Sequence, residues 1–227
     1  MSQGDRTTDD LRTSGQAEPG QAEPGQGEPG QAEPARSPKW LRRREQIIDT
    51  SAGVFATHGF HGTSTIELCD ANGLGKGALY YYIGSKEALL AAIHDRVMDE
   101  VISGAERVVD SGGTPTEQLT RLGGELLDVI SRYPDHVWVF LHEFPALTGD
   151  NASQFRSRRH QYERVVESVI AAGVDSGEFR DVDPRLTSRA WLGMHNYTYL
   201  WLKPDGRLSA AEVAEQFSDL FVHGVTR

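Results

Sequence analysis

The sequence predicts an all-α protein of about nine helices, in which three short helices precede a larger helical bundle. Apolar residues recur at intervals of three and four over most of the chain beyond residue 37, as they do on one face of a helix. Glycine and proline separate these periodic segments. No segment alternates apolar and polar residues between hairpin turns, as a half-buried strand would.

Composition limits the class of protein. The 227 residues allow one large domain or two small ones. Cys69 is the single cysteine, which excludes an internal disulfide framework and fits a reducing cytoplasm. No run approaches the roughly 18 apolar residues that cross a membrane, and the first ten residues lack the apolar core of a signal peptide. We therefore expect a cytoplasmic protein with no membrane partner.

A five-residue repeat dominates the start of the chain. Residues 16–35 read QAEPG-QAEPG-QGEPG-QAEPA. Proline in every repeat opposes a helix, and almost nothing in the repeat is apolar enough to bury. Residues 1–36 are therefore predicted to be a disordered tail, more simply a solvated arm than a site for a protein partner.

The first three helices follow from caps and glycine breaks. A helix begins near Pro38 and stops at Gly59. Thr63 or Ser64 caps a short helix over residues 65–72. A turn at residues 73–75 leads to a second short helix over residues 76–82. The apolar positions of the first helix are Trp40, Ile47, Ile48, Ala52 and Phe55, with Ser51 among them.

The remaining helices are longer. Gly84 ends the second short helix, and Ser85 caps the long helix that follows. The apolar stripe of this long helix consists of Leu89, Leu90, Ile93, Val97 and Val101. Later breaks leave helices at about residues 116–132, 135–144, 152–175, 184–202 and 209–224. We expect one domain over residues 37–84 and a second over residues 85–227.

Two short helices joined by a glycine turn fit a helix-turn-helix, whose second helix can enter the major groove of DNA. Leu79 and Ile83 are the expected inner pair of that helix, which leaves its other face for DNA. Hydroxyls and helix N-terminal amides suit phosphates, and basic side chains add attraction. The predicted DNA-binding residues are Arg42, Arg43, Arg44, Thr63, Ser64, Thr65, Gly75, Lys76, Gly77, Ala78, Tyr80, Tyr81, Tyr82 and Lys86.

The distribution of charge agrees with this assignment. The whole chain carries a formal charge of −10, which is unusual for a DNA-binding protein. Residues 36–90, however, hold seven Lys or Arg and five acids and are the only net-positive block. Local charge governs phosphate contact, so the acidic remainder is compatible with DNA binding. The arginines at 42–44 could also be a solvated charge run.

Residues 59–66, 72–83 and 85–90 together resemble the N-terminal DNA-binding domain of the TetR family of bacterial regulators. The shared features are a Gly-aromatic pair, a threonine-rich cap, a tight turn, a Gly-x-Leu-Tyr helix, and Lys-Glu before paired leucines. The resemblance implies a ligand-responsive regulator, by family default a repressor, that binds a near-palindromic operator as a homodimer.

Three positions depart from the family pattern. Gly75 stands where serine is usual, so a hydroxyl contact to the DNA backbone is missing, and Lys76 beside it could supply a charge instead. Tyr82 replaces the common histidine on the DNA face. Ile83 replaces phenylalanine in the core. DNA binding is therefore expected, but the preferred operator sequence does not carry over.

The resemblance also implies that the C-terminal helices bind an effector and form the dimer. Residues 191–201 are apolar nearly all round, and residues 213–224 carry an apolar face, so these last two helices could pair with their mates in a four-helix interface. The alternative is that they close the monomer core. Effector-pocket candidates are Trp138, Phe140, His142, Glu143, Phe144, Arg159, Tyr162, Trp191, Met194 and His195.

Arg156, Arg158 and Arg159 could bind an anionic group, although a solvated face is the commoner fate of such a cluster. The segments His142–Pro145, Gly177–Phe179 and Trp201–Gly206 are similar to a TetR subgroup that includes repressors of fatty-acid and sterol catabolism. That similarity implies an acyl-CoA or another acyl-type effector.

Two other classes of protein agree less well with the chain. An enzyme would need a catalytic motif, and the chain has no metal-ligand spacing, nucleophile elbow, phosphate loop or dinucleotide fingerprint. A helical protein-interaction module would explain the bundle and the tail but not the complete Gly-x-Leu-Tyr pattern. The sequence therefore predicts no enzymatic activity, no cofactor and no metal.

Overall fold

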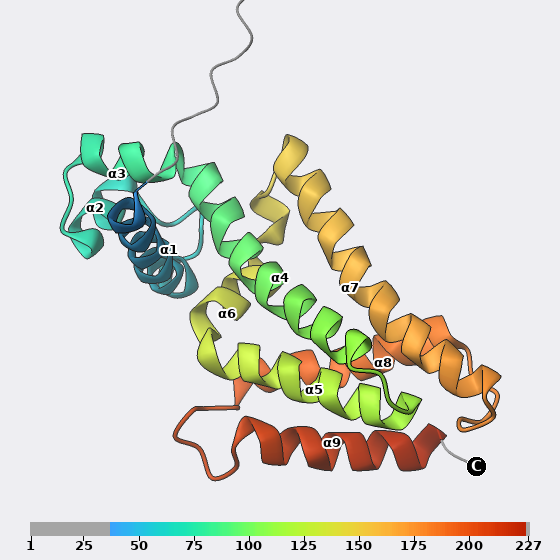
Figure 1. Ribbon diagram of the computed structural model, residues 1–227. Helices are drawn as coiled ribbons and strands as arrows, with labels where there is room; N and C mark the ends of the chain where they lie inside the picture. The colour runs from blue at the N-terminus through green and yellow to red at the C-terminus, as the bar shows by residue number, and fades with distance from the viewer. Residues whose placement is uncertain (1–36, 226–227) are drawn as a thin grey trace, which may run out of the picture. The chain divides into compact units, whose positions relative to one another are not determined.

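The computed structural model describes residues 37–225. The predicted tail, residues 1–36, lies outside them. Nine α-helices and two short 3-10 helices make up the described residues, which contain no strand, so the all-α prediction is confirmed (Figure 1). The elements are α1 (Pro38–His58), α2 (Thr65–Asn72), α3 (Lys76–Ile83), α4 (Lys86–Asp110), α5 (Pro115–Arg132), α6 (Pro134–His142), η1 (Phe144–Ala146), α7 (Gly149–Asp175), α8 (Pro184–Asn196), η2 (Tyr197–Leu200) and α9 (Ala210–Val225).

Helices α1 to α3 pack with the start of α4 around one apolar cluster, which we call the N-terminal core. Phe55 of α1, Leu68 of α2 and Leu79 of α3 are fully buried there. The two short helices α2 and α3 each bury only two or three side chains of their own, so tertiary packing rather than intrinsic propensity holds them.

The turn between α2 and α3 is fixed by its glycine. Gly73 ends α2 in the left-handed conformation at φ 62° and ψ 38°, which costs a side-chain-bearing residue more than glycine. The amide of Leu74 then donates to the Cys69 carbonyl at 3.0 Å. This geometry sets the direction in which α3 leaves α2.

Helix α4 belongs to both halves of the protein. Leu89, Leu90 and Ile93 at its start lie in the N-terminal core. Val97 and Val101, one to three turns later, lie in a second cluster, which we call the C-terminal core. Figure 1 shows α4 running from the three-helix group into the bundle. The division at residue 84 therefore stays a prediction, because one helix serves both cores.

Helix α5 lies at the centre of the C-terminal core. Leu122 and Leu127 are fully buried, and α5 packs against α4, α7, α8 and α9. Figure 1 shows α9 running alongside α5. Gly173 of α7 is in close contact with the Phe179 ring, which leaves no room for a Cβ atom at this position.

The predicted helix over residues 184–202 is shorter than expected. Helix α8 ends at Asn196, and η2 continues over Tyr197–Leu200. The Thr198 hydroxyl donates to the His195 carbonyl at 2.7 Å and competes with the regular helical bond there. Over residues 37–225, no helix combines the length and apolarity needed to cross a membrane.

Candidate functional site

Helix α3 has a buried side and an exposed side. Leu79 is fully buried and Ile83 nearly so, as the helical spacing predicts. Lys76 and Ala78 are exposed on the other side, and Tyr81 keeps 60% of its surface exposed. Helix α3 therefore exposes one face, with the Lys76 side chain at its start, while Leu79 and Ile83 on the other face stay buried in the N-terminal core.

The tyrosines of α3 are held by neighbouring side chains. The Tyr82 ring lies 5.6 Å from the Trp40 ring of α1, and Tyr81 meets Trp40 edge-on at 6.3 Å. The hydroxyls of Tyr80 and Thr65 share a hydrogen bond of 3.3 Å. These contacts restrict the rings of α3 while leaving part of each accessible.

Thr63 has a structural partner of its own. Its side chain is buried, and its hydroxyl donates to the Gly59 carbonyl at 2.8 Å, so a role in holding the turn before α2 competes with its predicted DNA contact. Ser64 is the cap: its hydroxyl accepts from the Glu67 amide at 3.2 Å, and Glu67 accepts from the Ser64 amide in return. These bonds to Ser64 lower the pKa of Glu67.

The three arginines of α1 do not act as one cluster. Arg42 is exposed. Arg43 is half-buried and donates to the Asn72 carbonyl at 2.8 Å, which ties α1 to the end of α2. A role for Arg43 in holding the fold therefore competes with its predicted DNA contact. Arg44 is half-buried as well.

Lys86 lies at the start of α4, with its Nζ 4.3 Å from the centre of the Phe60 ring. The predicted site residues Gly75 and Gly77 are accessible, and a Cβ atom at either would meet nothing within 4 Å. Ile66 of α2 is not among the predicted site residues, yet it keeps 73% of its surface exposed beside Thr65. The sequence pattern does not indicate that Ile66 is exposed, because an apolar residue in a short helix is usually expected in the core.

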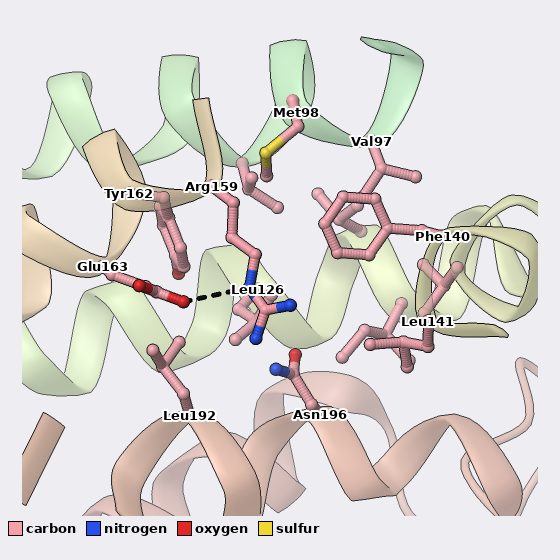
Figure 2. A pocket seen from close by; sticks show the side chains of 14 residues that line it. Val97, Met98, Leu126, Phe140, Leu141, Arg159, Tyr162, Glu163, Leu192 and Asn196 are labelled. Atoms are coloured by element: carbon pink, nitrogen blue, oxygen red, sulfur yellow. Dashed lines mark hydrogen bonds and ion pairs between the residues drawn. The ribbon is translucent and has the colours of Figure 1, made fainter. Parts of the chain in front are cut away.

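An apolar cavity of about 70 Å³ lies inside the C-terminal core. Helices α4, α5 and α6 supply its apolar wall, and α7 and α8 supply its polar side chains (Figure 2). Its lining residues are Val97, Met98, Val101, Leu126, Val129, Ile130, Val137, Phe140, Leu141, Arg159, Tyr162, Glu163, Leu192 and Asn196. We call it the inner cavity. Three of the ten predicted pocket residues line it: Phe140, Arg159 and Tyr162.

Six other candidates lie elsewhere. Trp191 and His195 are fully buried on the side of α8 that faces α5, where the His195 Nε2 would lie 2.7 Å from a Cβ atom at Gly123. Four more line neither this cavity nor the one described next: Trp138, His142, Glu143 and Met194. The sequence predicted that residues 191–201 are covered on several sides. It did not predict that Leu192 and Asn196 of α8 face the inner cavity.

A larger and more polar cavity of about 710 Å³ adjoins the inner one, and we call it the outer cavity. Both cavities are lined by Arg159, Glu163, Leu192 and Asn196. Phe144, the fourth predicted pocket residue inside a cavity, lines the outer one. Arg156 lines it too, whereas Arg158 points away and pairs with Asp95 and Asp99 of α4.

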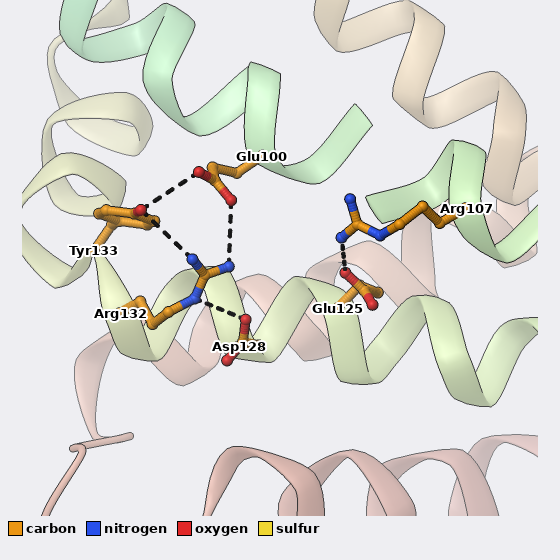
Figure 3. Close-up of polar contacts among 6 residues, drawn as sticks. All are labelled: Glu100, Arg107, Glu125, Asp128, Arg132 and Tyr133. Carbon is orange, nitrogen blue, oxygen red and sulfur yellow. Dashed lines mark hydrogen bonds and ion pairs between the residues drawn. The ribbon is translucent and has the colours of Figure 1, made fainter. Parts of the chain in front are cut away.

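Ion pairs hold α4 against α5 beside the inner cavity (Figure 3). Arg132 lies 2.7 Å from Asp128 on its own helix and 3.3 Å from Glu100 of α4. Arg107 of α4 lies 2.7 Å from Glu125 of α5. Most of these side chains are partly exposed, so each pair adds little stability, but together they fix the register of the two helices.

Large apolar side chains remain exposed on α8, on η2 and the residue that follows it, and on α9. They are Leu186, Tyr197, Leu200, Trp201 and Leu220. Other residues of the predicted α9 dimer face turn inward, since Val213 is buried and Phe217 and Phe221 pack on the C-terminal core. Helix α9 therefore closes the monomer core with one side, and Leu220 is the large apolar side chain that remains exposed on the other.

A helix-turn-helix with an accessible second helix, joined through α4 to a hollow helical bundle, defines a ligand-responsive DNA-binding regulator. The chain belongs to the TetR family of such regulators and is not an enzyme. The family profile described as "Bacterial regulatory proteins, tetR family" matches residues 47–93. The profile described as "Tetracyclin repressor-like, C-terminal domain" matches residues 112–225. Regulators of this family bind operator DNA, act as dimers and respond to small molecules.

Individual relatives agree with the family assignment. The transcriptional repressor KstR2 of Mycobacterium tuberculosis is 26% identical over 187 residues, which cover 82% of this chain and 94% of the repressor. The crystal structure of PfmR from Thermus thermophilus is 30% identical, covers 80% of this chain and 100% of its own, and has a TM-score of 0.74. AibR, solved with isovaleryl coenzyme A and operator DNA, is 32% identical over 81% of this chain and 98% of its own, with a TM-score of 0.70.

Proposed function

We propose that this regulator is a repressor that holds a near-palindromic operator as a homodimer and releases it when an acyl-type effector fills the inner cavity. The observation that supports this proposal is that α4 contributes side chains both to the inner cavity and to the N-terminal core. Val97, Met98 and Val101 line the cavity, and Leu89 and Leu90 of the same helix are buried in the N-terminal core.

A rigid helix shared by two cores transmits displacement between them. A ligand that shifts α4 at the cavity also shifts the attachment of α1 to α3, and hence the separation of the two recognition helices in a dimer. Half-sites one helical turn of DNA apart, about 34 Å, require a fixed separation. Release follows if the effector binds the displaced arrangement more tightly than the one that fits the operator.

On the DNA side, the accessible residues of α3 and its neighbours divide by chemistry. Lys76, Ala78 and Tyr82 are placed to meet base edges from the start and the open face of α3. Ser64, Thr65, Tyr80 and Lys86 are placed to bind phosphates. The accessible Gly75 and Gly77 allow the backbone to approach the DNA closely, and the exposed Tyr81 lies on the same helix. Arg42, and less directly Arg44, add sequence-independent attraction. Such a regulator would work in the cytoplasm, where the chromosome is.

Two observations support an acyl-type effector. The inner cavity is apolar over most of its lining, and Arg159 and Asn196 give it a polar end. Among the relatives, AibR binds isovaleryl coenzyme A, and KstR2 is described as a ketosteroid transcriptional regulator. An apolar cavity with a few polar groups at one end suits ligands of this kind.

The exposed strip on α8, η2 and α9 is the proposed dimer interface. Introducing an acid there, as in Leu220→Asp, should convert the dimer to a monomer, because a charge would be buried without a partner. Analytical ultracentrifugation measures the change, and operator affinity should fall at least about tenfold as the dimer dissociates. Val109→Asp, at an exposed apolar site on α4, is the matched control; if it dissociates the dimer equally, the interface is misplaced.

The central test is binding to DNA from upstream of the regulator's own gene. We expect Lys76→Ala to weaken operator binding about tenfold and to reduce the slope of log affinity against log salt concentration by about one. Tyr82→Ala should reduce discrimination between operator and unrelated DNA. Mobility shift and fluorescence anisotropy measure both effects. The exposed Lys203→Ala is the control for removal of a positive charge; wild-type binding by both α3 variants would contradict the assignment.

A further inference from the structure

The two adjoining cavities differ in size and chemistry, and this difference constrains the effector of the proposed function. The inner cavity is small and apolar, at about 70 Å³. The outer cavity is about ten times larger, at about 710 Å³. The two cavities share four lining residues, so a ligand that occupies both would pass between these side chains.

The inner cavity limits the apolar part of the ligand. A water-sized group needs roughly 10–15 Å³ of such space, so the inner cavity has room for about five to seven groups of that size. A short or branched aliphatic acyl group fits, whereas a long fatty chain or a fused sterol skeleton does not. Leu126, Val129 and Ile130 are buried in a close-packed core, which opposes expansion.

The outer cavity is cationic. Arg156, Arg159 and Arg189 line it together with His160, against a single acid, Glu163. Arginine forms bidentate hydrogen bonds with phosphate and carboxylate groups. A free short-chain acid would leave this large cationic space empty, whereas a bulky phosphorylated carrier would fill it.

The junction between the cavities carries a competing contact. Arg159 Nε donates to Glu163 Oε1 at 2.9 Å, and the other carboxylate oxygen of Glu163 lies 2.9 Å from His160 Nδ1. Figure 2 shows the Arg159 side chain between α7 and α8, beside Glu163 and Asn196. A ligand that passes the junction therefore finds Arg159 already oriented by Glu163, with its other N–H groups available as donors.

We propose that the effector is a short or branched acyl thioester of a phosphorylated nucleotide carrier, of the coenzyme A class. Its acyl group occupies the inner cavity, and its phosphates bind Arg156 and Arg189 in the outer cavity. This inference rests on the proposed function for the location of the effector, but it names the ligand by two independent properties, acyl size and carrier charge.

Direct binding by isothermal titration calorimetry, on full-length protein without DNA, tests the inference. Isovaleryl-CoA should bind at least about tenfold more tightly than palmitoyl-CoA, free CoA or isovalerate. The variant pair Arg156→Gln with Arg189→Gln should weaken isovaleryl-CoA binding about tenfold. Arg164→Gln, at an arginine of α7 outside the lining of both cavities, should leave it unchanged. Thermal melts establish that each variant is folded.

A gain of function provides a second measurement. Met98→Ala removes a buried side chain from the inner wall, so it should improve the affinity for hexanoyl-CoA relative to isovaleryl-CoA by several-fold. Equal or tighter binding of palmitoyl-CoA by the wild-type protein would overturn the size limit. Unchanged binding by the Arg156 and Arg189 pair would overturn the carrier assignment.

Operator release, measured separately by anisotropy, distinguishes this inference from the proposed function. If isovaleryl-CoA binds as expected but the operator stays bound, the inference holds and the proposed release mechanism fails. If a sterol or a long acyl chain without phosphate releases the operator while isovaleryl-CoA does not bind, the inference fails and the regulator function stands.

Discussion

Gly75 occupies the N-cap of α3, the first point at which this helix can meet DNA. Its backbone, at φ −74° and ψ 157°, is open to any residue, and its position lacks a side-chain cap. Nothing lies within 4 Å of where its Cβ atom would be. The glycine is therefore not required by the fold, and a serine would fit both the cap and the DNA surface.

Replacing Gly75 with serine should strengthen two interactions. The hydroxyl can accept a bond from an α3 amide, which adds roughly a few tenths of a kcal/mol to stability, and it can donate to a phosphate. We expect operator affinity to rise about threefold, measured by anisotropy. Gly75→Ala, which adds only the Cβ atom, is the control, and an equal gain with alanine would show that the hydroxyl is not the cause.

At this scale the sequence predicted which side of α3 is buried, because Leu79 and Ile83 are aliphatic residues at helical spacing, and both are buried. It did not separate Thr63 from Ser64. Both are hydroxyl residues before the same helix, and which of them caps it depends on the backbone angles. These angles place the Ser64 hydroxyl at an α2 amide and the Thr63 hydroxyl at the Gly59 carbonyl.

At the scale of elements, Arg158 joins α7 to α4. Its guanidinium lies 3.1 Å from Asp95 and also pairs with Asp99. Burial raises the pKa of Asp95, and Arg158 opposes that shift. The neighbouring residue, Arg159, lines both cavities. One turn of α7 therefore lines both cavities and contacts α4, the helix that continues from the N-terminal core.

Arg158→Gln should loosen this connection. Because the pair is partly exposed, we expect a stability decrease of only about 0.5–1 kcal/mol in urea unfolding. Hydrogen exchange should nevertheless become faster in α4 around Asp95 and in the facing part of α7. Arg164→Gln removes the same charge from another site on α7; if it accelerates exchange in α4 equally, the effect is one of net charge and not of the ion pair.

The sequence pattern does not predict which sides of helix α8 face which neighbouring helices. Nearly every position of residues 191–201 is apolar, which predicts coverage on several sides but not which side meets which neighbour. Trp191 and His195 face α5, whereas Leu192 and Asn196 face the cavities. A helix surrounded by partners has no polar face to set its rotation, so only the assembled bundle decides it.

At the scale of the whole molecule, each core contains a buried histidine. His94 lies among Phe140 and Phe155 in the N-terminal core, and His195 stacks on Trp191 in the C-terminal core. Burial lowers the pKa of both to about 4, against an ordinary 6.5. Each is therefore neutral in the folded protein at pH values where the unfolded chain is protonated.

Stability should consequently fall as the pH drops from about 6.5 towards 4. In this window the unfolded state binds more protons than the native state, so the free energy of unfolding decreases with falling pH. At about pH 4 the decrease approaches about 3 kcal/mol for each histidine. Urea unfolding at about pH 7.5, 6 and 5 measures it. His94→Gln should flatten the slope even if it lowers stability overall; an unchanged slope would contradict this account.

The coupling through α4 that we propose would also act in the opposite direction. Whatever factor the effector imposes on operator affinity, the operator must impose on effector affinity, because linkage between two binding sites is reciprocal. A regulator bound to its operator is then a poorer receptor than the same protein free in solution. The effector concentration that switches transcription would therefore depend on how strong each operator is, so one receptor could respond at different metabolite levels at different promoters.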